Sequence, residues 1–253
     1  MLYSILNAGA GVVDITNVTD IKTLTSFTFF IGTMAMMAAS VFFLFEMWSV
    51  DKKWRTSMLV SGLITFIAFV HYYYMRGYQM ETGMSPTFFR YVDWTLTVPL
   101  MCVEFYLITK KAGAKMGLMW RLIIASVIML VTGFFGETVY RDASVLWGVL
   151  SGAAYFYIAY LVWFGEVAKL GTSAGPQVAR AIRILAWFVF AGWSIYPLGY
   201  ILGTPGGLFG IQLVSDPEAA TAIMDIVYNI GDAVNKIGFG LVIYSLAVSS
   251  SND

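Results

Sequence analysis

Two apolar stretches of the sequence contain ionisable side chains, and these residues are the first candidates for chemistry. Arg90, Asp93 and Glu104 fall in one stretch, whereas Asp232 and Lys236 fall in another as an i, i+4 pair on one helix face. A charge at the centre of a bilayer costs at least about 2.5–3.5 kcal/mol on insertion scales. An ion-pair cluster that only fixes two helices is the alternative, but small residues and neutral hydrogen bonds can fix helices without buried charge. The pattern therefore indicates a functional site.

The first of these stretches has a spacing that suits proton transfer across a membrane. At helical geometry Asp93 and Glu104 point in directions about 20° apart and lie roughly 16 Å apart along the axis. Thr97 lies on the same stripe between them, and Arg90 precedes Asp93 on the outer side. Ionisable residues in file across a bilayer are typical of proton relays. A lysine such as Lys236, facing two carboxylates, can stay charged at neutral pH.

The elements that position these residues are predicted to be membrane-spanning helices. The chain has 253 residues, of which 59% are hydrophobic and only 12% charged, against about 25% charged in soluble domains. Its mean hydropathy is +0.75. Seven apolar stretches are long enough to cross a bilayer, and they cover residues 25–45, 58–75, 88–108, 120–138, 144–164, 182–202 and 222–248. The short connections predict one all-α domain, residues 1–253, folded as a seven-transmembrane-helix bundle.

The basic residues predict the orientation of this bundle, because cytoplasmic loops are enriched in lysine and arginine. One side has only Lys22, Arg76 and Arg141. The first, third and fifth connections hold Lys52, Lys53, Arg55, Lys110, Lys111, Lys115, Arg121, Lys169, Arg180 and Arg183. The N-terminus is therefore expected outside, with residues 1–22 as a short extracellular segment, and the C-terminus in the cytoplasm. The net charge of zero argues against a nucleic-acid partner, and we expect no metal.

Four motifs resemble those of microbial rhodopsins, and of proteorhodopsins most closely. Residues 90–99 (RYVDWTLTVP) with Glu104 are similar to the third helix of that family. Residues 228–236 (YNIGDAVNK) are similar to its retinal-binding helix, 193–197 (WSIYP) to its sixth helix and 71–77 (HYYYMRG) to its second. The resemblance covers all seven predicted spans, but it is weakest in the first 20 residues and in the loop from 203 to 217.

The resemblance implies all-trans retinal bound to Lys236 as a protonated Schiff base, and a buried lysine amine condenses readily with an aldehyde. It also implies that Asp93 is the counter-ion and primary proton acceptor, and that Asp232 is the second counter-ion. Glu104, in the apolar inner half, is then the donor that returns a proton from the cytoplasm. A carboxyl group in such surroundings is expected to stay protonated at rest.

Three positions distinguish the transported ion within the resembling family. Asp93, Thr97 and Glu104 match the pattern of outward proton pumps. Chloride pumps lack the first carboxylate, sodium pumps carry Asn, Asp and Gln, and sensory members usually lack the third carboxyl group. The sequence therefore predicts a light-driven outward proton pump rather than an enzyme. A photosensor with a slow photocycle is the alternative, and a seven-helix receptor or transporter without retinal is a third possibility.

The resemblance also assigns a retinal pocket. Trp193, Tyr196, Pro197 and Tyr200 follow an i, i+3, i+4, i+7 pattern on one helix face, although aromatic residues in apolar bundles usually serve as packing. The complete set of expected pocket residues is Lys236, Trp94, Met101, Met129, Gly133, Trp193, Tyr196, Pro197, Tyr200, Asp232 and Tyr72. Pro99 and Pro197 are each expected to kink their helices.

Met101 corresponds to the colour-tuning position, and an apolar residue there predicts green absorption. The only histidine, His71, is expected at the depth of Asp93, where the matching residue of the family pairs with the acceptor.

Three further residues have two interpretations each. Gly148 is interpreted first as a small residue for close helix packing, and alternatively as an opening beside the retinal ring for an antenna carotenoid. Glu137 and Asp225 are interpreted as solvated helix ends, and alternatively as part of the proton exit path. The family forms homo-oligomers, so a trimer or pentamer is expected.

Overall fold

The computed structural model describes residues 20–203 and 213–250, and nearly all of the predicted extracellular segment 1–22 lies outside this part of the chain. Within the described residues seven helical spans are long and apolar enough to cross a membrane, which confirms the predicted fold class. No strand occurs in these ranges. The helices are α2 (Ile21–Glu46), α3 (Arg55–Thr82), α4 (Thr87–Thr109), α5 (Met116–Phe134), α6 (Ser144–Trp163), α7 (Glu166–Ser173), α8 (Pro176–Trp187), α9 (Ile195–Gly203) and α10 (Pro217–Ser249).

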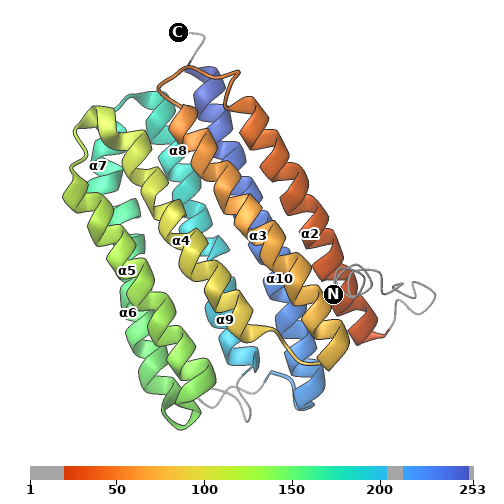
Figure 1. The fold of residues 1–253 in the computed structure, drawn as a ribbon. Helices are drawn as coiled ribbons and strands as arrows, with labels where there is room; N and C mark the ends of the chain where they lie inside the picture. Colours follow the sequence, from red (N-terminus) through yellow and green to blue (C-terminus); the bar gives the residue numbers. More distant parts are fainter. Residues whose placement is uncertain (1–19, 204–212, 251–253) are drawn as a thin grey trace.

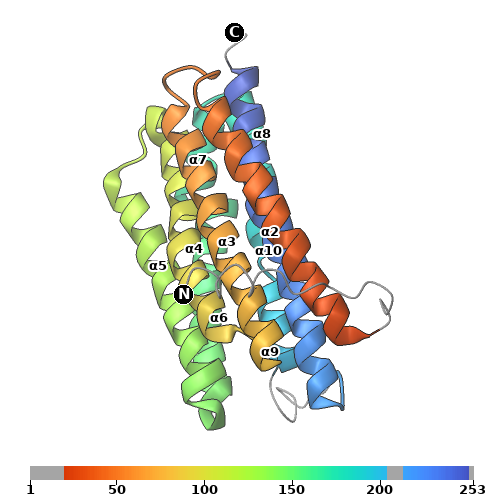
Figure 2. The same ribbon diagram turned by 45° about the vertical axis from the view of Figure 1, so that its right-hand side comes forward.

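The spans form a closed ring of neighbouring helices (Figure 1). Each of α2 to α6 packs against the next along the chain, α8 packs against α6, and α10 completes the ring by contacting α8, α9 and α2. The short helix α7 lies in the connection between α6 and α8. Figure 2 shows α2 alongside α10, so the first and last described helices are neighbours. This closure surrounds the middle of α4 and α10 with other helices.

Several helices extend beyond the predicted spans because capping residues, rather than apolar character, determine where they end. The helix α3 continues to Thr82 and ends at Gly83, whose left-handed φ of 68° favours glycine. The helix α10 begins at Pro217 after Asp216, whose side chain accepts the amide of Glu218. At the start of α2, Asp20 accepts the amide and hydroxyl of Thr23, and these donors hold the pKa of its carboxyl group below its ordinary value.

The sixth span is broken in the middle rather than simply kinked. It consists of α8, a π-helical turn over Phe188–Gly192, and α9. Pro197 cannot donate to the carbonyl of Trp193, which instead accepts the amide of Tyr196 at 3.1 Å. Other helices bind the carbonyl groups exposed at the break. Tyr155 of α6 donates to Val189 and Phe190, at 3.1 and 2.8 Å, and Asn235 of α10 donates to Gly192 at 2.9 Å. Such partners make an irregular backbone tolerable within a membrane.

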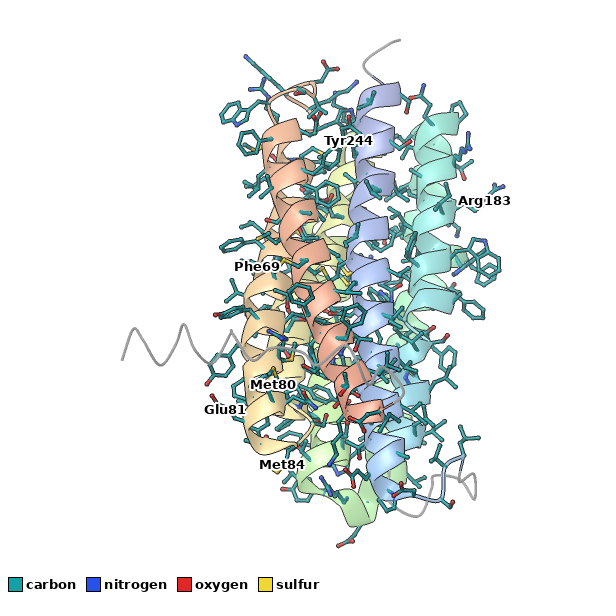
Figure 3. The ribbon with its side chains drawn as sticks, turned by 90° about the vertical axis from the view of Figure 1, so that its right-hand side faces the viewer. Phe69, Met80, Glu81, Met84, Arg183 and Tyr244 are labelled. Atoms are coloured by element: carbon teal, nitrogen blue, oxygen red, sulfur yellow. The ribbon has the colours of Figure 1, made fainter. Side chains whose placement is uncertain are left out.

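The distribution of polarity is the reverse of that in a soluble protein. Large apolar side chains such as Phe45 and Phe156 are exposed on the outer surface, whereas Asp93, Asp232 and Lys236 are buried. Figure 3 shows Arg183 pointing away from the bundle on α8, and Glu81 and Met84 near the lower end of the bundle, where α3 ends. This pattern suits a lipid environment, and the chain is a multi-pass membrane protein.

Candidate functional site

The centre of the bundle holds a lysine between two carboxylates. Lys236 of α10 donates from Nζ to Oδ2 of Asp232, one turn earlier, at 2.7 Å, and to Oδ2 of Asp93 on α4. The lysine side chain is 1% exposed. Helical spacing predicted the contact between Asp232 and Lys236 within α10. The second carboxylate, Asp93, reaches the lysine because α4 packs into the same bundle. The two negative charges stabilise a positive charge on Nζ that an apolar bundle would otherwise reject.

Hydroxyl groups and aromatic rings hold the carboxylates in place. Tyr196 of α9 donates to Oδ1 of Asp232 at 2.9 Å, and its ring lies 4.7 Å from that of Trp94 between centroids. Tyr72 of α3 is fully buried and donates to the carbonyl of Tyr228 at 3.3 Å. These contacts connect α3, α4, α9 and α10 around one polar centre.

Asp93 has two further neighbours that the sequence predicted. Thr97 is fully buried, and its hydroxyl donates to the carbonyl of Asp93 at 2.9 Å, which places the two residues on one stripe as expected. His71 of α3 lies with Nδ1 3.8 Å from Oδ1 of Asp93, and the same nitrogen is 2.9 Å from the carbonyl of Ile67. His71 is therefore at the depth of Asp93, as predicted, but it is not within direct hydrogen-bond distance.

A large apolar cavity lies beside this polar centre. Its volume is about 1000 Å³, at the upper end of the range of about 300–1000 Å³ for small-molecule pockets. Seven of the expected pocket residues line it, namely Trp94, Met129, Gly133, Trp193, Tyr196, Pro197 and Tyr200. Because Tyr196 also contacts Asp232, the cavity adjoins the lysine site. An elongated apolar aldehyde attached to Lys236 fits this donor set and this lining.

Four expected pocket residues do not line the cavity. Lys236 and Asp232 belong to the charged cluster beside it, Tyr72 packs on Phe29, and Met101 is buried in the helix core. Conversely, Tyr91, Tyr155 and other residues line the cavity without having been predicted. Tyr91 could have been found from its position three residues before Trp94 on the same helix face.

Arg90 occupies the outer half of the bundle, where it forms a buried ion pair that the sequence did not indicate. Its Nη2 donates to Oδ1 of Asp225 at 3.0 Å and to Oδ1 of Asn229 at 2.7 Å. The guanidinium also lies 5.0 Å from the ring centre of Phe29 and 5.4 Å from that of Tyr228. Asp225 is only 2% exposed, so its interpretation as a solvated helix end is wrong.

Glu137 is also more enclosed than a solvated helix end. It lies in the π-helical turn Phe135–Val139 and accepts the hydroxyl of Tyr91 at 2.7 Å. Since Tyr91 belongs to α4, this hydrogen bond connects the end of the fourth span to α4.

Glu104 lies in the inner half, as the sequence predicted, and no ion pair involves it within the described residues. It is fully buried, and Ser61 of α3 donates to its Oε1 at 3.5 Å. Oε2 has no hydrogen-bond partner within the described residues. Burial with so little hydrogen bonding favours the neutral carboxylic acid.

Gly148 of α6 is not at a tight helix contact. A Cβ atom added there would lie 3.7 Å from the ring of Tyr200, an ordinary contact distance, and the residue lines the large cavity. The interpretation of Gly148 as a small residue for close packing is therefore wrong.

Comparisons with known proteins agree with this architecture. The model of the bacteriorhodopsin-like protein family matches residues 23–250. A green-light absorbing proteorhodopsin from the gamma-proteobacterium EBAC31A08 is 41% identical over 235 residues, which cover 92% of this chain and 90% of that protein.

Two solved structures are also similar. The blue light-absorbing proteorhodopsin from Med12 is 39% identical, with a TM-score of 0.74 over 90% of this chain and 99% of that one. Xanthorhodopsin, described as a light-driven ion pump with dual chromophore, is 27% identical, with a TM-score of 0.80 over 92% of this chain and 95% of that one.

Proposed function

The chain belongs to the bacteriorhodopsin-like protein family, and from this membership we propose that it is a light-driven pump that carries protons out of the cell. The observation that carries the proposal is the contact of Lys236 with both Asp93 and Asp232 at the centre of seven membrane-spanning helices. It is a transporter rather than an enzyme.

The cofactor of this family is retinal, and Lys236 is the residue that holds it. All-trans retinal bound there as a protonated Schiff base supplies light absorption and a fall in the proton affinity of the lysine nitrogen. The cavity lined by Trp94, Trp193, Tyr196 and Pro197 supports this assignment, because it is apolar and adjoins the lysine. Its aromatic walls restrict the rotations available to a polyene.

Asp93 accepts the proton released from Nζ of Lys236, because the two groups already share a hydrogen bond. Asp232, held by Tyr196, is the second counter-ion beside the nitrogen. Thr97 fixes the helical turn that carries Asp93, and His71 adjusts the electrostatic field around that carboxyl group. Arg90 contributes a positive charge in the outer half, where it pairs with Asp225. Proton transfer to a positioned group of this kind accelerates a step by about 10²–10⁴-fold.

Glu104 returns a proton to Nζ of Lys236 from the cytoplasmic side. Its burial among apolar residues, with one long hydrogen bond from Ser61, supports a carboxylic acid that is protonated at rest. The acceptor on the outer side and the donor on the inner side give the transport its outward direction.

The test is illumination of cells that express the full chain with retinal supplied. We expect acidification of the medium that an uncoupler abolishes. Lys236→Ala should leave the protein colourless and the medium unchanged in the light, because no amine remains to hold the cofactor. Absence of light-driven acidification by the unmodified, coloured protein would refute the pump.

Green absorption is the colour we propose. Met101 is the supporting residue, since an apolar and polarizable side chain at the corresponding family position accompanies green absorption. Green- and blue-absorbing relatives are similar to this chain at 41% and 39% identity, so overall similarity does not separate the two. An absorption maximum in the blue would contradict the assignment, and Met101→Gln should shift a green maximum towards the blue.

A hydroxylated carotenoid is proposed as a second, antenna chromophore beside Gly148. The support is the lining of the large cavity by Gly148 and its exposed neighbour Val149, together with similarity to a relative that has a dual chromophore. Excitation of the added carotenoid should sensitise the retinal, and Gly148→Trp should abolish this transfer. Absence of energy transfer in the unmodified protein would remove the antenna.

We also propose that the chain is one domain and that its copies assemble as a trimer or pentamer, as in the family it resembles. Cross-linking in native membranes should then give a ladder that ends at three or five copies. A single band at the size of one chain would contradict assembly.

A further inference from the structure

One exposed face of α8 carries two arginine residues next to an aromatic surface, and the proposed pumping cycle uses neither arginine. Arg180, Arg183 and Trp187 are spaced i, i+3 and i+7, so they lie on one helix face. All three side chains are exposed, and Figure 3 shows Arg183 pointing away from the bundle. We propose that this face binds a phospholipid with an anionic headgroup. The arginines hold the phosphate, and the aromatic surface formed by Trp163, Trp187 and Phe190 holds the acyl chains.

The two arginines have no acidic partner of their own. Neither guanidinium forms an ion pair or a hydrogen bond within residues 20–203 and 213–250. Two acids at this end of the bundle are engaged elsewhere, since Asp51 lies 3.6 Å from Lys53 and Glu166 contacts Arg121. A guanidinium presents its N–H donors in a planar fork that matches two oxygens of a phosphate group. Two neighbouring positive charges without a counter-charge in the described chain therefore favour a phosphate ester.

The order of polarity along this face matches that of a lipid molecule. Tryptophan is enriched at the border between headgroups and hydrocarbon, and the headgroup layer beyond that border is about 5–7 Å thick. Arg183 lies about 6 Å from Trp187 along the helix axis, and Arg180 about 10 Å. With Trp187 at the border, Arg183 lies within the headgroup layer and Arg180 at its outer edge. Both side chains are long enough to reach one phosphate group.

The aromatic surface is held in a fixed orientation by its own contacts. Trp187 packs edge-on against Trp163 of α6, with ring centroids 5.0 Å apart and ring planes at 90°. The indole nitrogen of Trp163 donates to the carbonyl of Ala186 at 3.0 Å, which ties this ring to α8. The ring of Phe190 lies 6.1 Å from that of Trp187. Trp187 is nevertheless 54% exposed and Phe190 49%, so the surface is open to an acyl chain.

A second copy of this chain is the alternative occupant of this face. The same face of a second copy carries the same two positive charges, so a contact between two such faces would bring like charges together. A contact with another face would need a free carboxylate at this depth, and Asp51 and Glu166 already have cationic partners. A phospholipid brings its negative charge and its apolar chains at the depths where the face needs them, and it is therefore favoured.

The experiment measures the lipid preference of the full chain, with retinal bound, in vesicles of phosphatidylcholine to which phosphatidylglycerol with brominated acyl chains is added. Bromine quenches tryptophan fluorescence on contact, and the part of the quenching that Trp187→Phe removes belongs to Trp187. Brominated phosphatidylcholine in the same vesicles gives the reference. We expect phosphatidylglycerol to quench Trp187 at a several-fold lower content than phosphatidylcholine does.

The arginine variants test which groups create this preference. Arg183→Gln should lower it by about fivefold, because one basic residue near an anionic headgroup contributes about that factor. Arg180→Gln together with Arg183→Gln should lower it by about tenfold or more. Both variants should keep the absorption spectrum of the unmodified protein, because neither arginine lines the large cavity. An unchanged spectrum then shows that the variant is folded.

Lys110→Gln together with Lys111→Gln is the matched control. Both lysines are exposed at the same end of the bundle, and the double change removes the same two charges. Neither lysine lies on α8, so the preference measured at Trp187 should change by less than about twofold.

Four results would overturn the inference. The first is equal quenching of Trp187 by the two lipids in the unmodified protein, and the second is an equal loss in the lysine variant, which would indicate a general charge effect. Displacement of phosphatidylglycerol by inorganic phosphate at constant ionic strength would show that the face binds a free anion. A change in cross-linked copies in the arginine variant, with lipid preference unaltered, would show that the face contacts a second copy. These measurements do not involve proton transport, so their outcome is independent of the pump proposal.

Discussion

At the level of single residues, the proposed return of a proton through the inner half of the bundle depends on one carboxylic acid. Glu104 is fully buried, one oxygen accepts a hydrogen bond from Ser61 and the other has no partner within the described residues. A group in this setting holds its proton until a stronger base forms nearby. In the proposed cycle, deprotonated Lys236 is that base.

Glu104→Gln tests this assignment. Reprotonation of Lys236 should slow by about 10²-fold, because a positioned proton donor is removed. Protons must then come from bulk water, so the rate should fall as pH rises, whereas the unmodified protein should be nearly independent of pH. Flash photolysis over a pH series measures both effects.

Glu46→Gln, at the inner end of α2, is the control and should behave as the unmodified protein. A slow cycle that Glu104→Gln leaves unaltered would favour the photosensor.

The sequence predicted some of these residues well because their partners are local. Asp232 and Lys236, and likewise Asp93 and Thr97, are one helical turn apart, so helical spacing alone brings them together. The pair of Arg90 and Asp225 is 135 positions apart, and it depends on how α4 and α10 are rotated against each other. Sequence spacing within one helix carries no information on such a rotation.

At the level of elements, the broken sixth span is held together by other helices. Gly192 closes the π-helical turn, and its carbonyl accepts a hydrogen bond from Asn235 of α10 at 2.9 Å. Pro197 could be read from the sequence as the source of a kink. The π-helical turn could not, because it is stabilised by Tyr155 and Asn235, which lie on two other helices. The length of each apolar stretch was sufficient to predict that a span exists. Where each span ends or breaks is determined by capping residues and interhelical contacts, which the apolar length does not indicate.

Gly192→Ala should destabilise this break. An added Cβ atom would overlap the side chain of Asn235, and overpacking of a filled interior costs about 1–3 kcal/mol. We expect earlier thermal bleaching of the retinal absorbance and a shifted absorption maximum, because the adjacent Trp193 lines the large cavity in which we propose that retinal binds.

Gly117→Ala is the matched control for that change. An added Cβ atom at Gly117 meets nothing within 4 Å, so the variant should be as stable as the unmodified protein or slightly more stable. Equal bleaching temperatures for the two alanine variants would contradict the packing argument.

At the level of the whole molecule, the direction of transport depends on how the bundle is inserted. The excess of basic residues on the first, third and fifth connections predicts that this end faces the cytoplasm. Lys53 at that end donates to the carbonyl of Ser250 at 3.1 Å, so the end of α10 lies on the same side. The orientation stays a prediction of the sequence.

Cysteine labelling checks the orientation in intact cells. Arg141→Cys, on the predicted outer side, should react with a membrane-impermeant maleimide, whereas Lys111→Cys should react only after permeabilisation. Both positions are exposed. The unmodified protein is the control, since Cys102 is fully buried and should stay unlabelled. The reverse labelling pattern would place the N-terminus inside and contradict outward pumping.

The large cavity also has a consequence for how the protein acquires its pigment. Part of its wall is formed by Val149, Phe156 and Leu198, whose side chains are exposed on the flank of the bundle. Retinal is an apolar molecule that dissolves in the same lipid that surrounds this flank. The pigment can therefore arrive sideways through the bilayer after the chain has folded, without passing through water. Synthesis of the polypeptide and supply of its pigment are then independent events, and a membrane that holds the finished but colourless protein is ready to respond to light as soon as retinal becomes available.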